Sequence, residues 1–226
     1  MSLIHLVRHG QASAGTEDYD RLSLIGREQS RILGQWWQSQ GFSPDAVFHG
    51  TLLRQRDTAS HALQALVDNT QVSRMQAHAG LNEYNHRIIE SHFAADQAEY
   101  VPESMGFDDY TGIISRWRDH GESDKHPDIE PWAAFKARGW NTIQELCKQH
   151  ADSKEFVFFT SGGIIATVLA TVLDLDFEHT VDAIWRIRNT SITSFQITHE
   201  GKARLIEFNA VPHLQEHRKP HFITLI

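Results

Sequence analysis

Short apolar runs alternate with longer amphipathic segments along most of the 226-residue chain. The runs predict buried β-strands, and apolar residues at helical spacing predict helices. The predicted strands cover residues 3–7, 46–48, 72–77, 156–159, 192–198 and 203–208, of which the third is the weakest and the last two form a hairpin. The predicted helices cover residues 23–40, 52–66, 132–150 and 164–173. Alternating strands and helices indicate an α/β fold, in which helices cover both faces of a mainly parallel sheet.

Residues 84–134 differ in character from the rest of the chain. They are rich in His, Asp, Glu and Tyr, and their helical periodicity is broken. Three of the six prolines lie there, at positions 102, 127 and 131. We interpret this segment as an inserted, mostly helical cap within a single domain of residues 1–226.

Composition and charge exclude several classes of protein. Apolar residues make up 40 % of the chain, enough for a packed core, and the formal net charge of −8 argues against a nucleic-acid partner. Cys147 is the single cysteine, and there is no H-E-x-x-H pattern or Cys/His cluster, so we expect no metal. Without a signal peptide or a run of 18 apolar residues, we expect a cytoplasmic protein with no membrane contact. Adjacent Trp36 and Trp37 leave a core position or a homodimer interface open; the core is favoured because Trp36 fits an apolar helix stripe.

Four polar segments lie at the ends of predicted strands or in the loops that follow them. They are Arg8-His9-Gly10, residues 50–54, Leu81-Asn82-Glu83 and residues 160–163. Ligands of open α/β sheets bind beyond the carboxyl ends of the strands. We therefore expect these segments to assemble at one edge of the sheet.

The residue types in these segments suit a phosphoryl group. Arg8 and Arg54 offer paired N–H donors in a rigid geometry, whereas Arg56 falls on another helix face and is interpreted as solvent-exposed. Ser161 and Gly162 precede a predicted helix, where free backbone N–H groups and the helix dipole favour an anion.

His9 is the candidate nucleophile. It needs a neutral imidazole, and the like charge of the adjacent Arg8 lowers its pKa in that direction. An isolated histidine is more often a hydrogen-bonded turn residue, but the surrounding polar segments favour the nucleophile here.

The segments also match the motifs of a known family in the same order. Leu6-Val7-Arg8-His9-Gly10 resembles the signature of the histidine phosphatase superfamily, which includes the cofactor-dependent phosphoglycerate mutases. Residues 50–59 look like its second motif, and residues 81–83 like the segment that carries its general acid. Residues 158–163 match the turn that holds its second histidine, and residues 189–193 its late, Asn-containing strand entry. The resemblance extends from residue 3 to about residue 213, without detailed agreement in the cap.

This resemblance implies a reaction and a set of roles. His9 would be transiently phosphorylated while Arg8, Arg54 and a second histidine hold the phosphoryl oxygens. Glu83 would protonate the leaving group, and water would then attack the phosphohistidine. No cofactor or metal is required, because the arginines stabilise the charge.

Ser161 departs from the family pattern, because it stands where the second histidine is expected. A serine donates a hydrogen bond but brings no charge, and losing one such donor costs about 10²–10³ in rate, or roughly 3–4 kcal/mol. His213 is a candidate to compensate by reaching into the site.

The leading hypothesis is therefore a phosphatase of the histidine acid phosphatase type, for which Ser161 predicts reduced activity. Its substrate would be a phosphorylated small molecule or phosphohistidine. The alternative is a catalytically impaired protein that binds a phosphorylated ligand or has a regulatory role. A phosphoglycerate mutase is disfavoured. Mutases of the family usually carry more basic residues around the substrate carboxylate, whereas residues 11–22 contain only one, Arg21.

Overall fold

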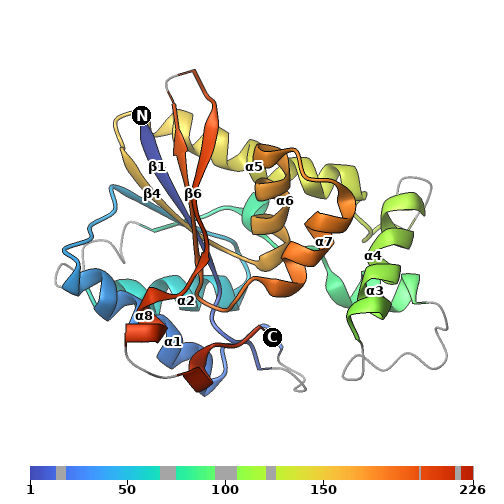
Figure 1. Cartoon of the computed structure of the whole chain (residues 1–226), viewed down its shortest axis with the longest axis horizontal. Coiled ribbons are helices and arrows are strands. Elements are labelled where there is room, and N and C mark those ends of the chain that lie inside the picture. The colour runs from blue at the N-terminus through green and yellow to red at the C-terminus, as the bar shows by residue number, and fades with distance from the viewer. Residues whose placement is uncertain are drawn as a thin grey trace.

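The computed structural model describes residues 1–13, 19–66, 75–94, 106–120, 126–198, 200–216 and 220–225. Its strands are β1 (Ser2–Arg8), β2 (Ala46–His49), β3 (Gln76–Ala77), β4 (Glu155–Thr160), β5 (Ile192–Ile197) and β6 (Ala203–Ala210). They form one sheet in the order β3-β2-β4-β1-β5-β6 (Figure 1). The first four strands run parallel, while β5 is antiparallel to β1 and β6. The mainly parallel sheet and the late hairpin are thus confirmed; β3 is only two residues long, and residues 72–74 of the predicted strand lie outside the described residues.

The α-helices of the described residues are α1 (Leu24–Ser39), α2 (Leu53–Gln64), α3 (His86–Phe93), α4 (Phe107–His120), α5 (Trp132–Gln149), α6 (Gly162–Leu173), α7 (Phe177–Arg186) and α8 (Pro212–Glu216). Two short 3₁₀ helices are η2 (Ala79–Leu81) and η4 (Pro220–Phe222). The four predicted helices correspond to α1, α2, α5 and α6, the last of which begins two residues earlier than predicted. Helices α7 and α8 are additional findings.

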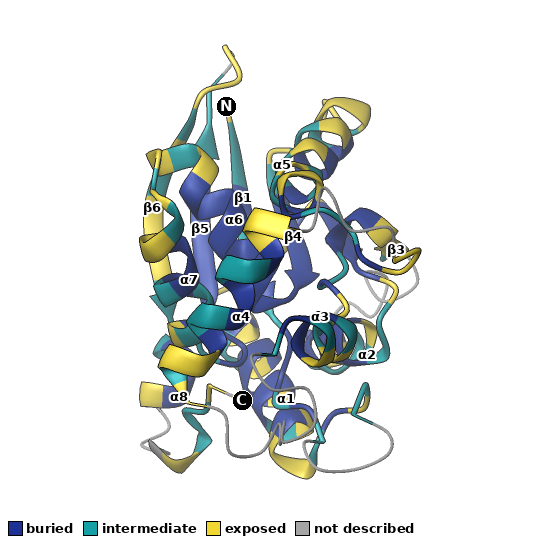
Figure 2. Ribbon diagram, turned by 90° about the vertical axis from the view of Figure 1, so that its right-hand side faces the viewer, coloured by how far each residue is buried: buried dark blue, intermediate teal, exposed yellow. Residues whose placement is uncertain are grey.

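Successive residues of the central strands face opposite sides of the sheet, and each side has its own apolar cluster. Leu6 and Phe158 belong to the cluster that includes residues of α5 and α6. Val7 and Phe159 belong to the cluster that includes residues of α1 and α2. Buried residues accordingly gather in the strands and on the inner faces of the helices (Figure 2). Helices therefore cover both faces of the sheet, as the sequence predicts.

The tryptophan pair on α1 divides between two environments. Trp37 is 2 % exposed and belongs to the second cluster, whereas Trp36 is half-buried at its edge and contacts the His213 ring. The favoured core position is occupied, but chiefly by Trp37. None of the helices in the described ranges is long and apolar enough to span a bilayer.

The predicted cap contributes two described helices, α3 and α4, which pack against each other. Their inner residues, including Ile89 and Trp117, join the same apolar cluster as the sheet. Helix α5 begins at Trp132, inside the predicted cap, while residues 95–105 and 121–125 lie outside the described part of the chain. The division into a domain and an inserted cap stays a prediction.

Candidate active site

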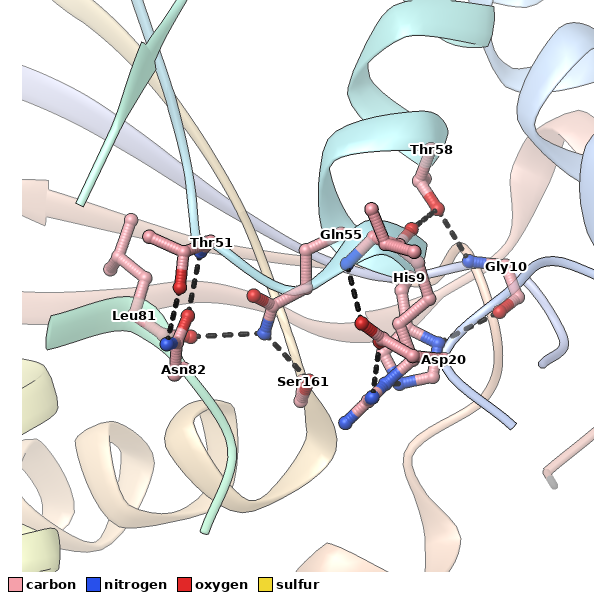
Figure 3. Close-up of polar contacts among 11 residues, drawn as sticks. His9, Gly10, Asp20, Thr51, Gln55, Thr58, Leu81, Asn82 and Ser161 are labelled. Atoms are coloured by element: carbon pink, nitrogen blue, oxygen red, sulfur yellow. Dashed lines mark hydrogen bonds and ion pairs between the residues drawn. The ribbon is translucent and has the colours of Figure 1, made fainter. Parts of the chain in front are cut away.

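The predicted polar segments meet at the carboxyl ends of β1, β2 and β4. His9 follows β1, and its backbone N–H donates to the carbonyl of Thr160 at the end of β4, at 2.9 Å. Gly50 follows β2, and its N–H donates to the carbonyl of Phe159 at 3.1 Å. The side chains around His9 and Ser161 therefore lie along one edge of the sheet (Figure 3).

His9 is held in a single tautomer by two side-chain contacts. Its Nδ1 lies 2.8 Å from the carbonyl of Gly10, and its Nε2 lies 3.2 Å from Nε of Arg54. A carbonyl only accepts and a guanidinium only donates, so Nδ1 carries the proton and Nε2 keeps its lone pair. The backbone carbonyl of His9 in turn accepts from Asn189 Nδ2 at 3.1 Å. Asn189 thus secures the nucleophile candidate from the late strand entry.

The pKa of His9 lies well below its ordinary value. Burial is the largest cause, since only 4 % of the residue is exposed, and the positive charges of Arg54 and Arg8 add to it. All three effects disfavour the imidazolium ion. The predicted neutral imidazole therefore has both a hydrogen-bonding and an electrostatic basis.

Arg54 lies in the first turn of α2 and links His9 to an acidic residue. Besides its contact with His9, it donates through Nη1 to Asp20 Oδ1 at 2.7 Å. Asp20 Oδ2 accepts from the backbone N–H of Leu53 at 2.8 Å. This bond satisfies one N–H group at the start of α2, where the N-cap residue itself makes no side-chain hydrogen bond. No sequence signal pointed to Asp20. Arg56 is exposed, as predicted, and it pairs with Asp57.

Arg8 combines anchored and unused donors. Its Nη1 donates to the backbone carbonyls of Ile187 and Leu225. Its Nε is buried and has no hydrogen-bond partner. A Cβ built on Gly162 would lie 3.7 Å from this nitrogen, so the unused donor faces the start of α6. Because a buried unsatisfied donor costs about 1–3 kcal/mol, this arrangement suits a site that a ligand completes.

Glu83 lies across the site, against the first turn of α6. Its Oε2 accepts from the N–H of Gly163 at 2.8 Å, and its Oε1 accepts from the N–H of Tyr84 at 3.2 Å. A Cβ on Gly163 would come within 2.2 Å of the carboxylate, so only glycine permits this approach. Burial raises the pKa of Glu83, and this effect outweighs the two hydrogen bonds and the arginine charges, which lower it. The carboxyl group is consequently suited to retain a proton.

Ser161 is fully buried at the N-cap of α6, next to Gly162. Its hydroxyl oxygen accepts from Nε2 of Gln55 at 2.8 Å. His213, the candidate to compensate for the second histidine, is buried: its Nε2 lies 3.0 Å from Thr190 Oγ1, and its ring packs on Trp36. Gln55, like Asp20, was not predicted from the sequence, although it stands next to Arg54 in the second motif.

Further aromatic and basic side chains lie beside Arg54. The ring centroids of Tyr19 and His86 lie 4.7 Å apart. The guanidinium groups of Arg54 and Arg87 lie over the Tyr19 ring, at 5.4 and 5.8 Å from its centroid. Burial, Arg54 and Arg87 together lower the pKa of His86 to about 4. His86 is therefore neutral near pH 7. Among the described residues, no group of three or more His, Cys, Asp or Glu side chains is arranged to hold a metal ion.

Comparison with known proteins agrees with this architecture. Similar structures include a phosphoserine phosphatase from Entamoeba histolytica, at 21 % identity over 95 % of this chain and 100 % of that one, with a TM-score of 0.63. The alpha-ribazole phosphatase from Shigella flexneri shows 18 % identity over 92 % and 96 %, with a TM-score of 0.63. A mycobacterial glucosyl-3-phosphoglycerate phosphatase shows 21 % identity over 94 % and 99 %, also with a TM-score of 0.63.

At these identities the likeness shows a shared fold. Among curated protein sequences, none matches the chain significantly. The family model of the histidine phosphatase superfamily (branch 1), however, matches residues 4–210, which is most of the chain. This protein therefore belongs to the histidine phosphatase superfamily.

Proposed function

We propose that the protein is a phosphatase that transfers a phosphoryl group from a phosphorylated small molecule, or from phosphohistidine, to His9 and then to water. The observation that carries this proposal is the state of His9. Its Nε2 bears a lone pair, its pKa is strongly lowered, and Arg54 lies within hydrogen-bond distance. A neutral imidazole beside guanidinium groups is a nucleophile prepared for an anionic electrophile.

In the first step, Nε2 of His9 attacks the phosphorus atom and forms an N–P bond as the bond from phosphorus to the leaving group breaks, a P–O bond in an ester and a P–N bond in phosphohistidine. The leaving oxygen or nitrogen takes the proton of the Glu83 carboxyl group. In the resting site Arg54 Nε occupies the Nε2 lone pair, so it must move to a phosphoryl oxygen when substrate binds. The unused Nε of Arg8 supplies a second donor to the same group.

In the second step, water attacks the phosphorus atom of phosphohistidine. The Glu83 carboxylate accepts a proton from that water, the N–P bond breaks, and inorganic phosphate leaves. His9 is then neutral again and Glu83 is protonated, so the cycle closes. The raised pKa of Glu83 suits both roles, because the group holds a proton for the first step and regains it in the second.

The competing function is a binding protein that uses the same site for a phosphorylated ligand. Ser161 favours it, because a neutral hydroxyl stabilises less charge than a histidinium ion. The half-buried proton donor Glu83 favours the enzyme, because a binding protein has no need of a carboxyl group held at the site with a raised pKa. The three solved relatives are named as phosphatases of different phosphorylated compounds, which supports the reaction class and leaves the substrate open.

Hydrolysis of p-nitrophenyl phosphate and of a panel of phosphorylated metabolites tests the proposal. We expect a His9→Ala substitution to lower kcat by about 10⁴-fold or more, because it removes the nucleophile. Rapid quenching at alkaline pH, without acid, should trap a phosphorylated wild-type protein that carries the phosphoryl group on His9.

The matched control is His49→Ala. His49 ends β2, is also buried, and makes the same contact between its Nδ1 and the carbonyl of the next residue, at 2.6 Å. This variant should lose stability yet retain turnover when assayed while folded. Turnover that survives in His9→Ala would contradict the assignment of the nucleophile. Phosphate binding without turnover of any substrate would favour the binding protein.

A further inference from the structure

Ser161 occupies a helix N-cap position without acting as a cap. Serine is common at this position because its oxygen usually accepts from the N–H groups of the first turn. Here the hydroxyl makes no such bond. The N–H of Gly163 donates to Glu83 instead. Helix capping therefore does not account for a serine at this position.

The Ser161 oxygen is turned toward Gln55, and the direction of that hydrogen bond can be assigned. The two hydrogens of the Gln55 amide nitrogen go to the carbonyl of Leu81, at 3.0 Å, and to Ser161 Oγ, at 2.8 Å. The Leu81 carbonyl only accepts, so the nitrogen end of the amide must face it. Ser161 is thereby the acceptor from Gln55, and its own proton is left for a different acceptor.

Gln55 holds this orientation at an energetic cost. The amide is fully buried, and its Oε1 has no hydrogen-bond partner. A buried polar atom without a partner costs about 1–3 kcal/mol. The oxygen lies where a Cβ of residue 50 would be, at 1.8 Å, so Gly50 provides the space for it. Gly50 and Gln55 thus accommodate an arrangement that packing alone does not favour.

Ser161 stands between two residues that contact groups of the phosphoryl site. The preceding carbonyl, of Thr160, binds the backbone N–H of His9, and the next residue, Gly162, lies against the unused Nε of Arg8. We propose that Gln55 is a positioning residue, which directs the proton of Ser161 toward a phosphoryl oxygen bound at His9. The pair then supplies a neutral donor where the family has its second histidine. This inference rests on the proposed function.

A double-mutant cycle on kcat for p-nitrophenyl phosphate tests the pair. Ser161→Ala should lower kcat by about 10²-fold, as expected for one lost donor to the transition state. Gln55→Leu should cause a similar loss in the wild-type protein but almost none in the Ser161→Ala background, because it acts through the hydroxyl. Gln55→Glu keeps the size of the side chain but accepts the Ser161 proton, so it should reproduce the loss. Melting temperatures identify any variant that fails to fold.

Thr167→Val is the matched control. Thr167 is also fully buried, in the helix that follows Ser161, and its Oγ1 donates to the carbonyl of Ile164 at 3.0 Å. We expect kcat within about threefold of the wild type, because its lost bond is structural. A comparable loss in Thr167→Val, or additive losses from Ser161→Ala and Gln55→Leu, would show that Gln55 only supports the fold.

The outcomes for this inference and for the proposed function are separable. If His9→Ala abolishes turnover and Ser161→Ala leaves it unchanged, the phosphatase stands and the positioning role is wrong. If no substrate is turned over, binding of orthovanadate still tests the donor, and both Ser161→Ala and Gln55→Leu should weaken it at least tenfold. Unchanged vanadate affinity in these variants, or a wild-type protein that binds no vanadate, would overturn the inference.

Discussion

Two buried histidines end strands on either side of β4 in the same local geometry, yet only one has the surroundings of a nucleophile. His9 follows β1 and His49 ends β2, and they are 4 % and 5 % exposed. Each ring donates from Nδ1 to the carbonyl of the glycine that follows it, at 2.8 and 2.6 Å. This shared contact selects the tautomer in both. It therefore says nothing by itself about catalysis.

The difference between the two lies in the charges around the ring. Nε2 of His9 accepts from Arg54, and both Arg54 and Arg8 lower the pKa of its imidazole. A buried histidine at a strand end is thus an ordinary structural element. It becomes a nucleophile candidate when cations keep it neutral and stand ready for an anion.

After the loss of His9 itself, the largest expected effect comes from removing the cation that distinguishes His9. Arg54→Met should lower kcat by about 10³-fold, since it deletes a donor to the transition state and leaves Asp20 as an uncompensated negative charge beside the substrate. Steady-state hydrolysis of p-nitrophenyl phosphate measures this. In the Arg54→Met variant, His9 should stay buried in the same conformation, as His49 is, but lose its reactivity.

Arg56→Met is the control for that substitution. It removes an arginine two positions along the same helix, but one whose guanidinium is exposed and paired with Asp57. Its kcat should stay close to that of the wild type, because an exposed ion pair contributes little. Similar losses in the two variants would mean that general charge, rather than the contact with His9, sustains activity.

The sequence predicted the end of β1 better than the end of β4. Arg8, His9, Arg54 and Glu83 come together as expected, because each lies at or next to the end of a predicted element. Gln55 and Asp20 escaped notice for a physical reason: their roles depend on contacts between distant segments, 106 and 34 positions apart in the chain. Helix α7 was overlooked for a different reason. Its signal was present, in the capping Asp176 and the apolar residues Phe177 and Val181.

A smaller effect is expected at Glu83, and it depends on the substrate. Glu83→Gln should lower kcat/KM for an alkyl phosphate by about 10²-fold, because an alkoxide leaving group needs a proton. For p-nitrophenyl phosphate the loss should be under about tenfold, since that leaving group departs as a stable anion. Parallel measurements of kcat/KM report the phosphorylation of His9 in both cases. Equal losses on the two substrates would contradict the role of general acid.

The pH dependence of kcat/KM tests the protonation states assigned to His9 and Glu83. His9 must be neutral, and its lowered pKa places the acidic limb of the profile well below the ordinary histidine range. Glu83 must be protonated, and burial raises its pKa, so activity on alkyl phosphates should fall as the pH rises through that raised value. Glu83→Gln should abolish this alkaline limb and leave the acidic limb in place. A profile that keeps both limbs in the variant would assign the proton to another group.

The smallest expected effect tests how much of the positive charge around His9 is available to a bound phosphate. Asp20 takes one donor of Arg54 and also serves the N–H of Leu53 at the start of α2. Asp20→Asn should therefore tighten the binding of inorganic phosphate by about two- to fivefold, the equivalent of a partly exposed ion pair. It should also lower the melting temperature slightly, because the helix start loses a negative charge. Calorimetric titration at low and high salt measures the first effect, which should shrink as salt screens the carboxylate. Weaker phosphate binding in Asp20→Asn would mean that Asp20 orients Arg54 for the ligand rather than competing with the ligand for Arg54. The contact between Arg54 and His9 would then depend on Asp20 as well.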